Sequence, residues 1–397
     1  MTLITDAAEA AAFCRRLSEA DVITVDTEFL REKTFWPRLC LVQIAGPDEA
    51  AAIDPLAEGM NLSPVFELMS NEKILKVFHA ARQDLEIFHH LMGHLPKPLF
   101  DTQLAAMVCG FGDSVSYETL VAKLAKKRVD KSSRFTDWSV RPLSERQITY
   151  ALSDVTHLRV VYAKLAKKLA QNNREAWLAA EVAVLGRTET YVTEPDLSYK
   201  RIKTRTPTPR FLAILREVAA WREREAQTRN MPRGHILRDE SMLEIAHHTP
   251  KTVDALARIR GMGRRLAEGS RGAELLKLIE KGTLVPDADC PQPPPHRDLP
   301  RGIGPLTDLL KVLLKMRCED ADVAQRLVAS SADLELLAAD GEKAGVPALE
   351  GWRREVFGDS ALKLRSGEIA LAANGRKVIE FVVEKTPETD ADADADA

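Results

Sequence analysis

Strand-like segments occur only in the first part of this chain, and this limits what the chain can fold into. Between residues 1 and 170, apolar runs rich in β-branched residues alternate with segments of helical period. The first strands follow one another with short connections and the later ones are separated by helices, so we expect an α/β domain with a mixed five-stranded sheet and flanking helices. The expected strands are Val22–Thr27, Leu39–Ala45, Ala50–Ile53, Ile74–Phe78 and Leu99–Asp101; the expected helices are Asp6–Ala20, Ser63–Ser70, Ala81–Met92, Thr102–Gly110, Tyr117–Ala125 and Ser144–Gln171.

Two proline-containing breaks divide the rest of the chain, which is helical by period. Residues 193–209 (TEPDLSYKRIKTRTPTP) and 286–305 both contain prolines that interrupt helices, so we interpret them as a basic linker and a Pro-rich linker. The stretches 210–285 and 306–385 show no strand signal, and the second is similar to a drifted copy of the first. The sequence therefore predicts an α/β domain over 1–192, two all-α domains and a disordered acidic tail over 386–397.

The composition is typical of a cytoplasmic protein. The chain has 397 residues, 29% of them charged, and a formal net charge of −3. No apolar run is long enough to span a bilayer and no secretory signal begins the chain, so we expect no membrane association. The five cysteines occur singly and predict free, mostly buried thiols. No coiled-coil pattern is present, and we expect a monomer.

Two carboxylates interrupt the apolar strand DVITVDTEF at residues 21–29. Successive side chains on a strand point to opposite faces, so Thr24, Asp26 and Glu28 share one face. Two carboxylates about 4 Å apart repel by roughly 4 kcal/mol at an effective dielectric of about 20. The pair therefore indicates a bound cation.

Two later segments supply further acids. KVFHAARQDLEIF (76–88) places Asp84 in the first turns of a helix that follows a strand. The expected helix over 144–171 carries Tyr150 and Asp154 one turn apart on the same face. Four carboxylates and one phenol are thus available to converge on one site.

Oxygen ligands without histidine or cysteine favour Mg²⁺ or Mn²⁺ over zinc. Two such ions about 3.5–4 Å apart can activate a water and stabilise the leaving oxygen of a phosphodiester. In this hypothesis Asp26 bridges two divalent cations, Glu28 and Asp154 complete the ion on the nucleophile side, and Asp84 holds the other. Tyr150 orients the water and does not act as the base, because the pKa of a phenol is about 10.

The segments VDTEF, HAARQDLEIF and YALSDV resemble the three exonuclease motifs of the DEDD superfamily, in the subclass with a tyrosine four residues before the last aspartate. Three flanking segments, FWPRLCLVQIA (35–45), LFDTQLAA (99–106) and RFTDWSVRPLSERQITYALSDV (134–155), are similar to the ribonuclease D family. The resemblance implies a ribonuclease H-like sheet and 3′→5′ hydrolysis that releases nucleoside 5′-monophosphates. It also implies catalytic roles for Asp26, Glu28, Asp84, Tyr150 and Asp154.

Residues 209–263 resemble the HRDC domain, a helical module shared by RecQ-type helicases and ribonuclease D. This implies a first HRDC domain over 210–285 and a divergent HRDC-like domain over 306–385. The segment 199–238 is strongly basic, which suits contact with RNA phosphates. The candidate RNA-binding residues are Phe35, Trp36, His79, Lys203, Arg205, Arg229, Arg233, Arg264 and Arg265.

Three of these assignments have structural alternatives. Phe35 and Trp36 either pack in a core or stack on the terminal nucleotide. His79 either positions substrate or is structural. Gln43, on the strand next to the first two acids, is expected to be an ordinary hydrogen-bonded sheet residue.

The sequence as a whole predicts a 3′–5′ exoribonuclease that trims tRNA precursors and other structured RNAs with short single-stranded 3′ ends. A DNA exonuclease of the same chemistry is the nearer alternative, because no motif reads a 2′-hydroxyl. A non-catalytic RNA-binding or helicase-associated module is the more distant one, and it predicts that Asp26→Asn leaves function intact.

Overall fold

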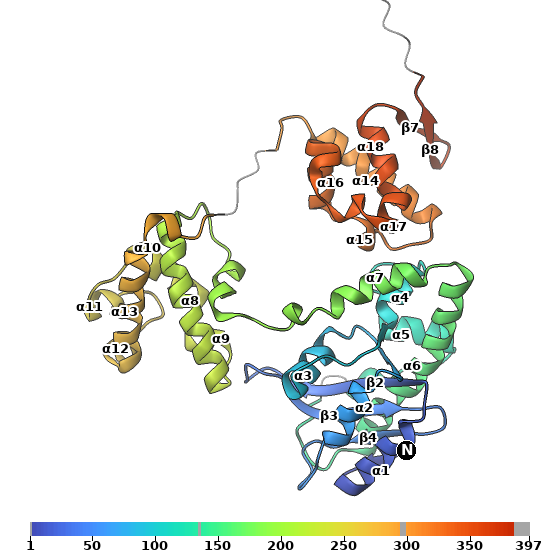
Figure 1. Cartoon of the computed structure of the whole chain (residues 1–397), viewed down its shortest axis with the longest axis horizontal. Helices are drawn as coiled ribbons and strands as arrows, with labels where there is room; N and C mark the ends of the chain where they lie inside the picture. The colour runs from blue at the N-terminus through green and yellow to red at the C-terminus, as the bar shows by residue number, and fades with distance from the viewer. Residues whose placement is uncertain (1, 134–135, 294–298, 385–397) are drawn as a thin grey trace, which may run out of the picture. The chain divides into compact units, whose positions relative to one another are not determined.

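Six strands form one mixed sheet in the N-terminal part of the chain, in the order β1-β4-β3-β2-β5-β6. Figure 1 labels three of them, β2, β3 and β4. β2, β3 and β4 form an antiparallel meander, whereas β1 pairs parallel with β4, β5 with β2, and β6 with β5. The strands are β1 Thr2–Ile4, β2 Val22–Leu30, β3 Arg38–Ala45, β4 Ala50–Ile53, β5 Leu75–Phe78 and β6 Leu99–Asp101. The mixed sheet is confirmed, but the predicted count of five is wrong. The added strand, β1, has only three residues and is too short to show an alternating pattern.

The computed structural model describes residues 2–133, 136–293 and 299–384. The tail predicted over 386–397 and part of the second proline-rich break lie outside these residues. The described residues pack as two compact units, one made of 2–101, 127–133, 136–160 and 182–293, the other of 102–126, 161–181 and 299–384. Segments of the predicted N-terminal domain therefore group with the C-terminal helices.

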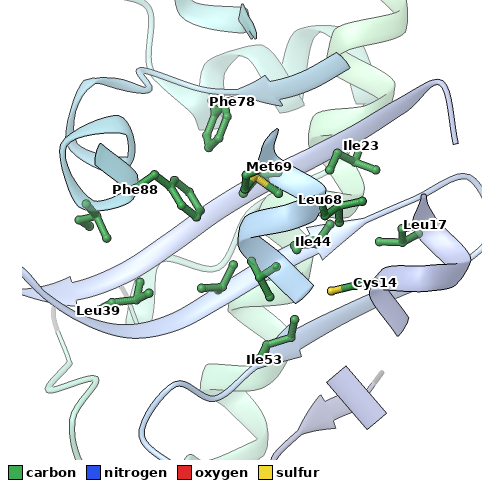
Figure 2. Packing of buried hydrophobic residues seen from close by; sticks show 14 of the residues in the cluster. Cys14, Leu17, Ile23, Leu39, Ile44, Ile53, Leu68, Met69, Phe78 and Phe88 are labelled. Atoms are coloured by element: carbon green, nitrogen blue, oxygen red, sulfur yellow. The ribbon is translucent and has the colours of Figure 1, made fainter. Parts of the chain in front are cut away.

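Helices α1 (Ala7–Leu17), α2 (Ser63–Ser70) and α3 (Arg82–Met92) cover one face of the sheet. α1 begins where the Asp6 carboxylate accepts the N–H groups of Ala8 and Glu9, each at 2.9 Å. Figure 2 shows side chains from these helices packed against the strands. This apolar layer holds the sheet rigid behind the face that carries the acids.

Helix α6 (Glu145–Gln171) crosses the opposite face. Its Ala151 and Leu152 pack with Leu41 of β3 and with Trp138, which precedes the helix. The Thr24 hydroxyl donates to the Val155 carbonyl at 2.8 Å. Because Thr24 shares its face with Asp26, this bond places α6 over the two strand acids.

The first HRDC-like region is helical, with its own apolar core. Its helices are α8 Pro209–Arg229, α9 Arg233–Ile236, α10 Asp239–His248, α11 Val253–Ala257, α12 Arg264–Glu268 and α13 Ser270–Leu284. The preceding segment 193–209 is partly folded, because it contains a 3₁₀ helix, Pro195–Arg201, and Ile202 is buried in the same core.

The second unit combines helices from both parts of the chain. It holds α4 (Thr102–Val108), α5 (Tyr117–Leu120) with a following π-helical turn (Val121–Ala125), and most of α7 (Glu175–Leu185), which the sequence did not predict. Trp177 of α7 stacks on Trp352 with ring centroids 4.5 Å apart. The C-terminal helices are α14 Gly304–Asp320, α15 Gln325–Val328, α16 Ser331–Asp340, α17 Gly351–Arg353 and α18 Asp359–Arg365.

The prediction of an all-α fold over 306–385 is wrong at its C-terminal end. Strands β7 (Ile369–Asn374) and β8 (Lys377–Val382) form an antiparallel hairpin (Figure 1). Asn374 pairs with Lys377, and Gly375 adopts φ 62° in the two-residue loop. An Asn-Gly pair between apolar runs is a hairpin signal that was available in the sequence.

All five cysteines are free and buried, as the sequence predicts. Among the described residues, no helix combines the length and apolar character needed to cross a membrane.

Candidate active site

The carboxylates of Asp26, Glu28 and Asp154 form one cluster, with one oxygen of each lying within 4.8 Å of the others. Asp26 and Glu28 come from the same face of β2, and Asp154 comes from the turn of α6 that the Thr24 bond holds against that face. All three side chains are partly or largely buried. The structure therefore brings together three of the four predicted acids.

The fourth acid, Asp84, lies beside this cluster in the first turn of α3. It is buried, and the Thr27 hydroxyl donates to its carboxylate at 2.5 Å. Thr27 points to the opposite face of β2 from Asp26, so Asp84 reaches the strand from the other side. Asp84 is outside the three-carboxylate cluster but close enough that the charge of Asp26 acts on its pKa.

Burial makes these carboxylates poor anions without a counter-charge. Desolvation raises the pKa of Asp26 to about 6. The pKa of Asp84 is raised well above its usual range, mainly by burial and further by the charge of Asp26. A bound cation would reverse both effects, because it favours the ionised carboxylates.

Tyr150 lies on α6 one turn before Asp154 and hydrogen-bonds to its carboxylate. Burial and the charges of Asp154, Glu28 and Asp26 raise the pKa of this phenol above its ordinary value. The ring lies near Trp138, with centroids 6.1 Å apart. Tyr150 therefore keeps its proton at neutral pH and donates it in the hydrogen bond to Asp154.

Gln43 differs from its prediction. It is fully buried on β3 directly opposite Asp26, and neither polar atom of its amide has a hydrogen-bond partner within the described part of the chain. Leaving a buried polar group unpaired costs about 1–3 kcal/mol. An unpaired amide beside a cluster of oxygen donors fits a site that takes up a hydrated divalent cation, since the donor set contains only hard oxygen ligands.

A β-bulge lies directly beside the cluster. Glu28 pairs with Leu41, but the next residue, Phe29, pairs with Leu39, so Cys40 is the extra residue. Sequence reasoning missed this feature, as well as the contacts of Arg141 and Asp54 beneath it. Two signals were available: Arg141 lies in the segment 134–155 that is similar to the ribonuclease D family, and an acid, Asp54, directly follows the apolar strand β4.

The two aromatic candidates for RNA binding, Phe35 and Trp36, make contacts within the protein. Phe35 is buried in the core of the first HRDC-like region, with the Arg233 guanidinium 4.4 Å from its ring centroid. The Trp36 ring stacks on the His90 ring, with ring centroids 4.2 Å apart. The N–H groups of both residues donate to the Asn230 side chain, at 3.1 and 2.9 Å. The packing alternative therefore describes these two side chains.

His79 lies at the end of β5, and burial lowers its pKa. In the chain it precedes α3, which carries Asp84, and its role in substrate positioning stays a prediction.

Several of the candidate basic residues are neutralised internally. Arg229 pairs with Glu225 at 2.8 Å, Arg233 with the buried Glu223 at 2.5 Å, and Arg264 with Glu268 at 2.8 Å. In the described parts of the chain, none of the ion pairs includes the exposed Lys203, Arg205 or Arg265. The structure thus separates the candidates into paired and unpaired cations.

Comparisons with known proteins agree with this geometry. A family profile described as 3′-5′ exonuclease matches residues 1–170, and one described as HRDC domain matches residues 211–279. Ribonuclease D of Gluconacetobacter diazotrophicus is 50% identical over 376 residues, covering 95% of each chain. Ribonuclease D of Granulibacter bethesdensis is 50% identical over 378 residues, again covering 95% of each.

The fold is also similar to that of a solved relative. The crystal structure of Escherichia coli RNase D, described as an exoribonuclease involved in structured RNA processing, matches with a TM-score of 0.79 at 29% identity, over 92% of this chain and 98% of that one. Motifs, acid cluster and relatives therefore lead to one assignment. This chain belongs to the ribonuclease D family and is a 3′–5′ exoribonuclease with an HRDC domain.

Proposed function

We propose that this exoribonuclease works with two divalent cations, Mg²⁺ or Mn²⁺, held by Asp26, Glu28, Asp154 and Asp84. The observation that carries the proposal is the cluster of three carboxylates from β2 and α6 within 4.8 Å of one another. The raised pKa of Asp26 and the unpaired amide of Gln43 support it, because both are costly without a cation. Divalent cations in such a site supply positive charge for an attacking water and for the leaving 3′-oxygen.

The protein's own side chains then have distinct tasks. Asp26, Glu28 and Asp154 present oxygen ligands on one side of β2, and Thr27 holds the Asp84 carboxylate from the other. Tyr150 keeps its proton, donates to Asp154 and orients the attacking water. These tasks are those of a site that releases nucleoside 5′-monophosphates from an RNA 3′ end.

For the substrate, we propose tRNA precursors and other structured RNAs with short single-stranded 3′ ends. The support is the relative from Escherichia coli, whose described role is structured RNA processing. We further propose that the enzyme acts in the cytoplasm as a monomer. The molar mass of the purified chain, measured by light scattering, tests whether it is a monomer.

The first test follows a 3′-extended tRNA labelled at its 5′ end, incubated with Mg²⁺, Mn²⁺ or EDTA. The wild type should shorten it one nucleotide at a time and stop near the mature end. EDTA should abolish the ladder, and so should Asp154→Asn.

The matched control is Glu145→Gln, which changes an exposed acid of the same helix. It should trim as the wild type does. A matched DNA 3′ end tests the alternative substrate. Wild-type protein that binds the RNA but leaves it intact with either metal would contradict the proposal.

A further inference from the structure

The guanidinium of Arg141 uses all five of its N–H groups beside the acid cluster. Nε and Nη2 donate to the two carboxylate oxygens of Asp54, each at 2.6 Å. Nη2 also donates to the Cys40 carbonyl at 2.8 Å, and Nη1 donates to the carbonyls of Trp138 and Val140 at 2.7 and 2.9 Å. A guanidinium has five donors in a planar fork, so this one is fully satisfied within the protein.

The counter-ion of Arg141 is itself held in place. Asp54 directly follows β4 and is 2% exposed, and its carboxylate accepts the N–H of Leu56 at 2.9 Å. Its own N–H donates to the carbonyl of Ile4 at 2.9 Å, which ties it to β1. The sheet therefore fixes the position of the guanidinium.

Cys40 links Arg141 to the acid cluster. It is the extra residue of the β-bulge, and Glu28 is the last residue of β2 before the register shifts. A bulge takes a residue out of the ladder and bends the strands, which changes the direction of adjacent side chains. Because Arg141 binds the Cys40 carbonyl, it holds the bend that sets the direction of Glu28.

Trp138 links the same guanidinium to the other side of the site. Its side chain is 2% exposed, and its ring lies 6.1 Å from that of Tyr150. By binding the Trp138 carbonyl, Arg141 fixes the segment against which Tyr150 packs. One side chain thus connects the strand that carries Glu28 with the helix that carries Tyr150 and Asp154.

We propose that Arg141, with Asp54 as its fixed counter-ion, is a positioning residue for the exonuclease reaction, holding the bulge beside Glu28 and the tryptophan beside Tyr150. The inference rests on the proposed metal site of Asp26, Glu28 and Asp154. Arg141 acts through these residues and has no role in holding substrate.

The test is Arg141→Lys in the full chain. Lysine keeps a positive charge opposite the buried Asp54, but its three donors cannot bridge Asp54, Cys40 and Trp138 in one plane. We expect kcat on the 3′-extended tRNA to fall about 10- to 100-fold, the range for losing a residue that orients a metal ligand, with KM changed less than about twofold. Mn²⁺ binding, measured by isothermal titration calorimetry without RNA, should weaken by a similar factor.

Two further variants separate positioning from folding. The double variant Asp54→Asn with Arg141→Gln removes the pair without leaving a buried charge, and it should show the same losses in kcat and Mn²⁺ binding. Arg16→Lys is the matched control, because Arg16 also makes two bonds to one carboxylate, Glu49, at 2.8 and 2.7 Å. It should behave as the wild type.

Three results would overturn the inference: wild-type kcat and Mn²⁺ affinity in Arg141→Lys, a change in KM alone, or a loss of activity fully explained by the unfolded fraction seen in a thermal melt. Failure of the proposed function is a different result, in which the wild type hydrolyses no RNA with either metal. The Mn²⁺ titrations then still decide whether Arg141 shapes the acid cluster.

Discussion

At the scale of single residues, burial decides how the acids behave. The pKa of Asp26 lies at about 6 in the folded protein against an ordinary 3.8. Between these values the folded chain binds more protons at Asp26 than the unfolded chain does, so the free energy of unfolding falls as pH rises through this window. The buried Asp84, whose pKa is also raised, adds to the same trend.

We therefore expect the melting temperature of the metal-free protein, measured in EDTA, to fall between about pH 4 and about pH 6 more than it does in Asp26→Asn. Comparing the two proteins removes the contribution of all other titrating groups. Mg²⁺ should stabilise the wild type more at pH 7 than at pH 5, because protons compete for the same oxygens. Identical pH dependence in both proteins would mean that Asp26 has an ordinary pKa.

Tyr150→Phe should lower kcat by about 100-fold, the scale for losing one positioned hydrogen-bond donor. The ring stays against Trp138, so KM and Mn²⁺ affinity should change little. The alkaline side of the kcat–pH profile should be the same in both proteins, because the raised pKa keeps the phenol protonated. Loss of an alkaline limb in the variant would show instead that the phenol titrates during the reaction. Tyr199→Phe, in the HRDC core, is the control.

At the scale of elements, glycine lets two helices of the first HRDC-like region approach closely. A Cβ at Gly282 of α13 would lie 2.7 Å from the Cα of Ile214 in α8 and 3.2 Å from the Ala213 carbonyl oxygen. These are backbone atoms, so no flexible side chain can move aside. The helix pair must separate to accept any larger residue.

Gly282→Ala should therefore lower the free energy of unfolding of this region by about 1–3 kcal/mol, as overpacking does. The control is Gly234→Ala, since a Cβ there meets nothing within 4 Å. Chemical denaturation followed by tryptophan fluorescence measures both, because Trp221 of the same core contributes to the signal of the five tryptophans. Equal midpoints would show that α8 and α13 can separate without cost.

At the scale of the whole molecule, the charge available to RNA is smaller than the sequence suggests. Arg224 pairs with Asp196 at 2.6 Å and Arg229 with Glu225 at 2.8 Å, whereas Lys203 and Arg205 are exposed and take part in no ion pair among the described residues. In the free protein, the carboxylate of each ion pair already compensates part of the charge of its arginine. Unpaired cations release counterions when they meet phosphates.

We expect Lys203→Ala with Arg205→Ala to weaken tRNA binding and to reduce the slope of log K against log salt by up to about 1.4–1.8 if each contacts one phosphate. Arg224→Ala with Arg229→Ala removes the same formal charge and should reduce the slope less. Fluorescence anisotropy over a range of salt concentrations measures both. Hydrolysis of a short oligonucleotide should be unchanged in either variant, because the acid cluster is intact. Equal slopes would remove residues 203–205 from the RNA-binding surface.

The sequence by itself determined the features that depend on residues close together in the chain. The period of a strand places Asp26 and Glu28 on one face, and the period of a helix places Tyr150 one turn from Asp154. The motifs carrying these residues were enough to predict the family, and the order and connections of the expected strands were enough to predict a mixed sheet. The strand β1 was missed because three residues carry little periodic signal, whereas the β7–β8 hairpin was missed although its Asn374-Gly375 pair indicates a turn.

Only the tertiary structure decided which distant residues meet. The bond from Thr27 to Asp84 joins positions 57 residues apart, and that from Arg141 to Cys40 joins positions 101 apart. The ion pair of Arg233 with the buried Glu223 and the position of its guanidinium over the Phe35 ring are likewise tertiary contacts that no local pattern predicts. Such contacts follow from how faces, bulges and loops pack together. Local periodicity determines which residues share one face of a helix or strand, but it does not determine which distant face packs against them.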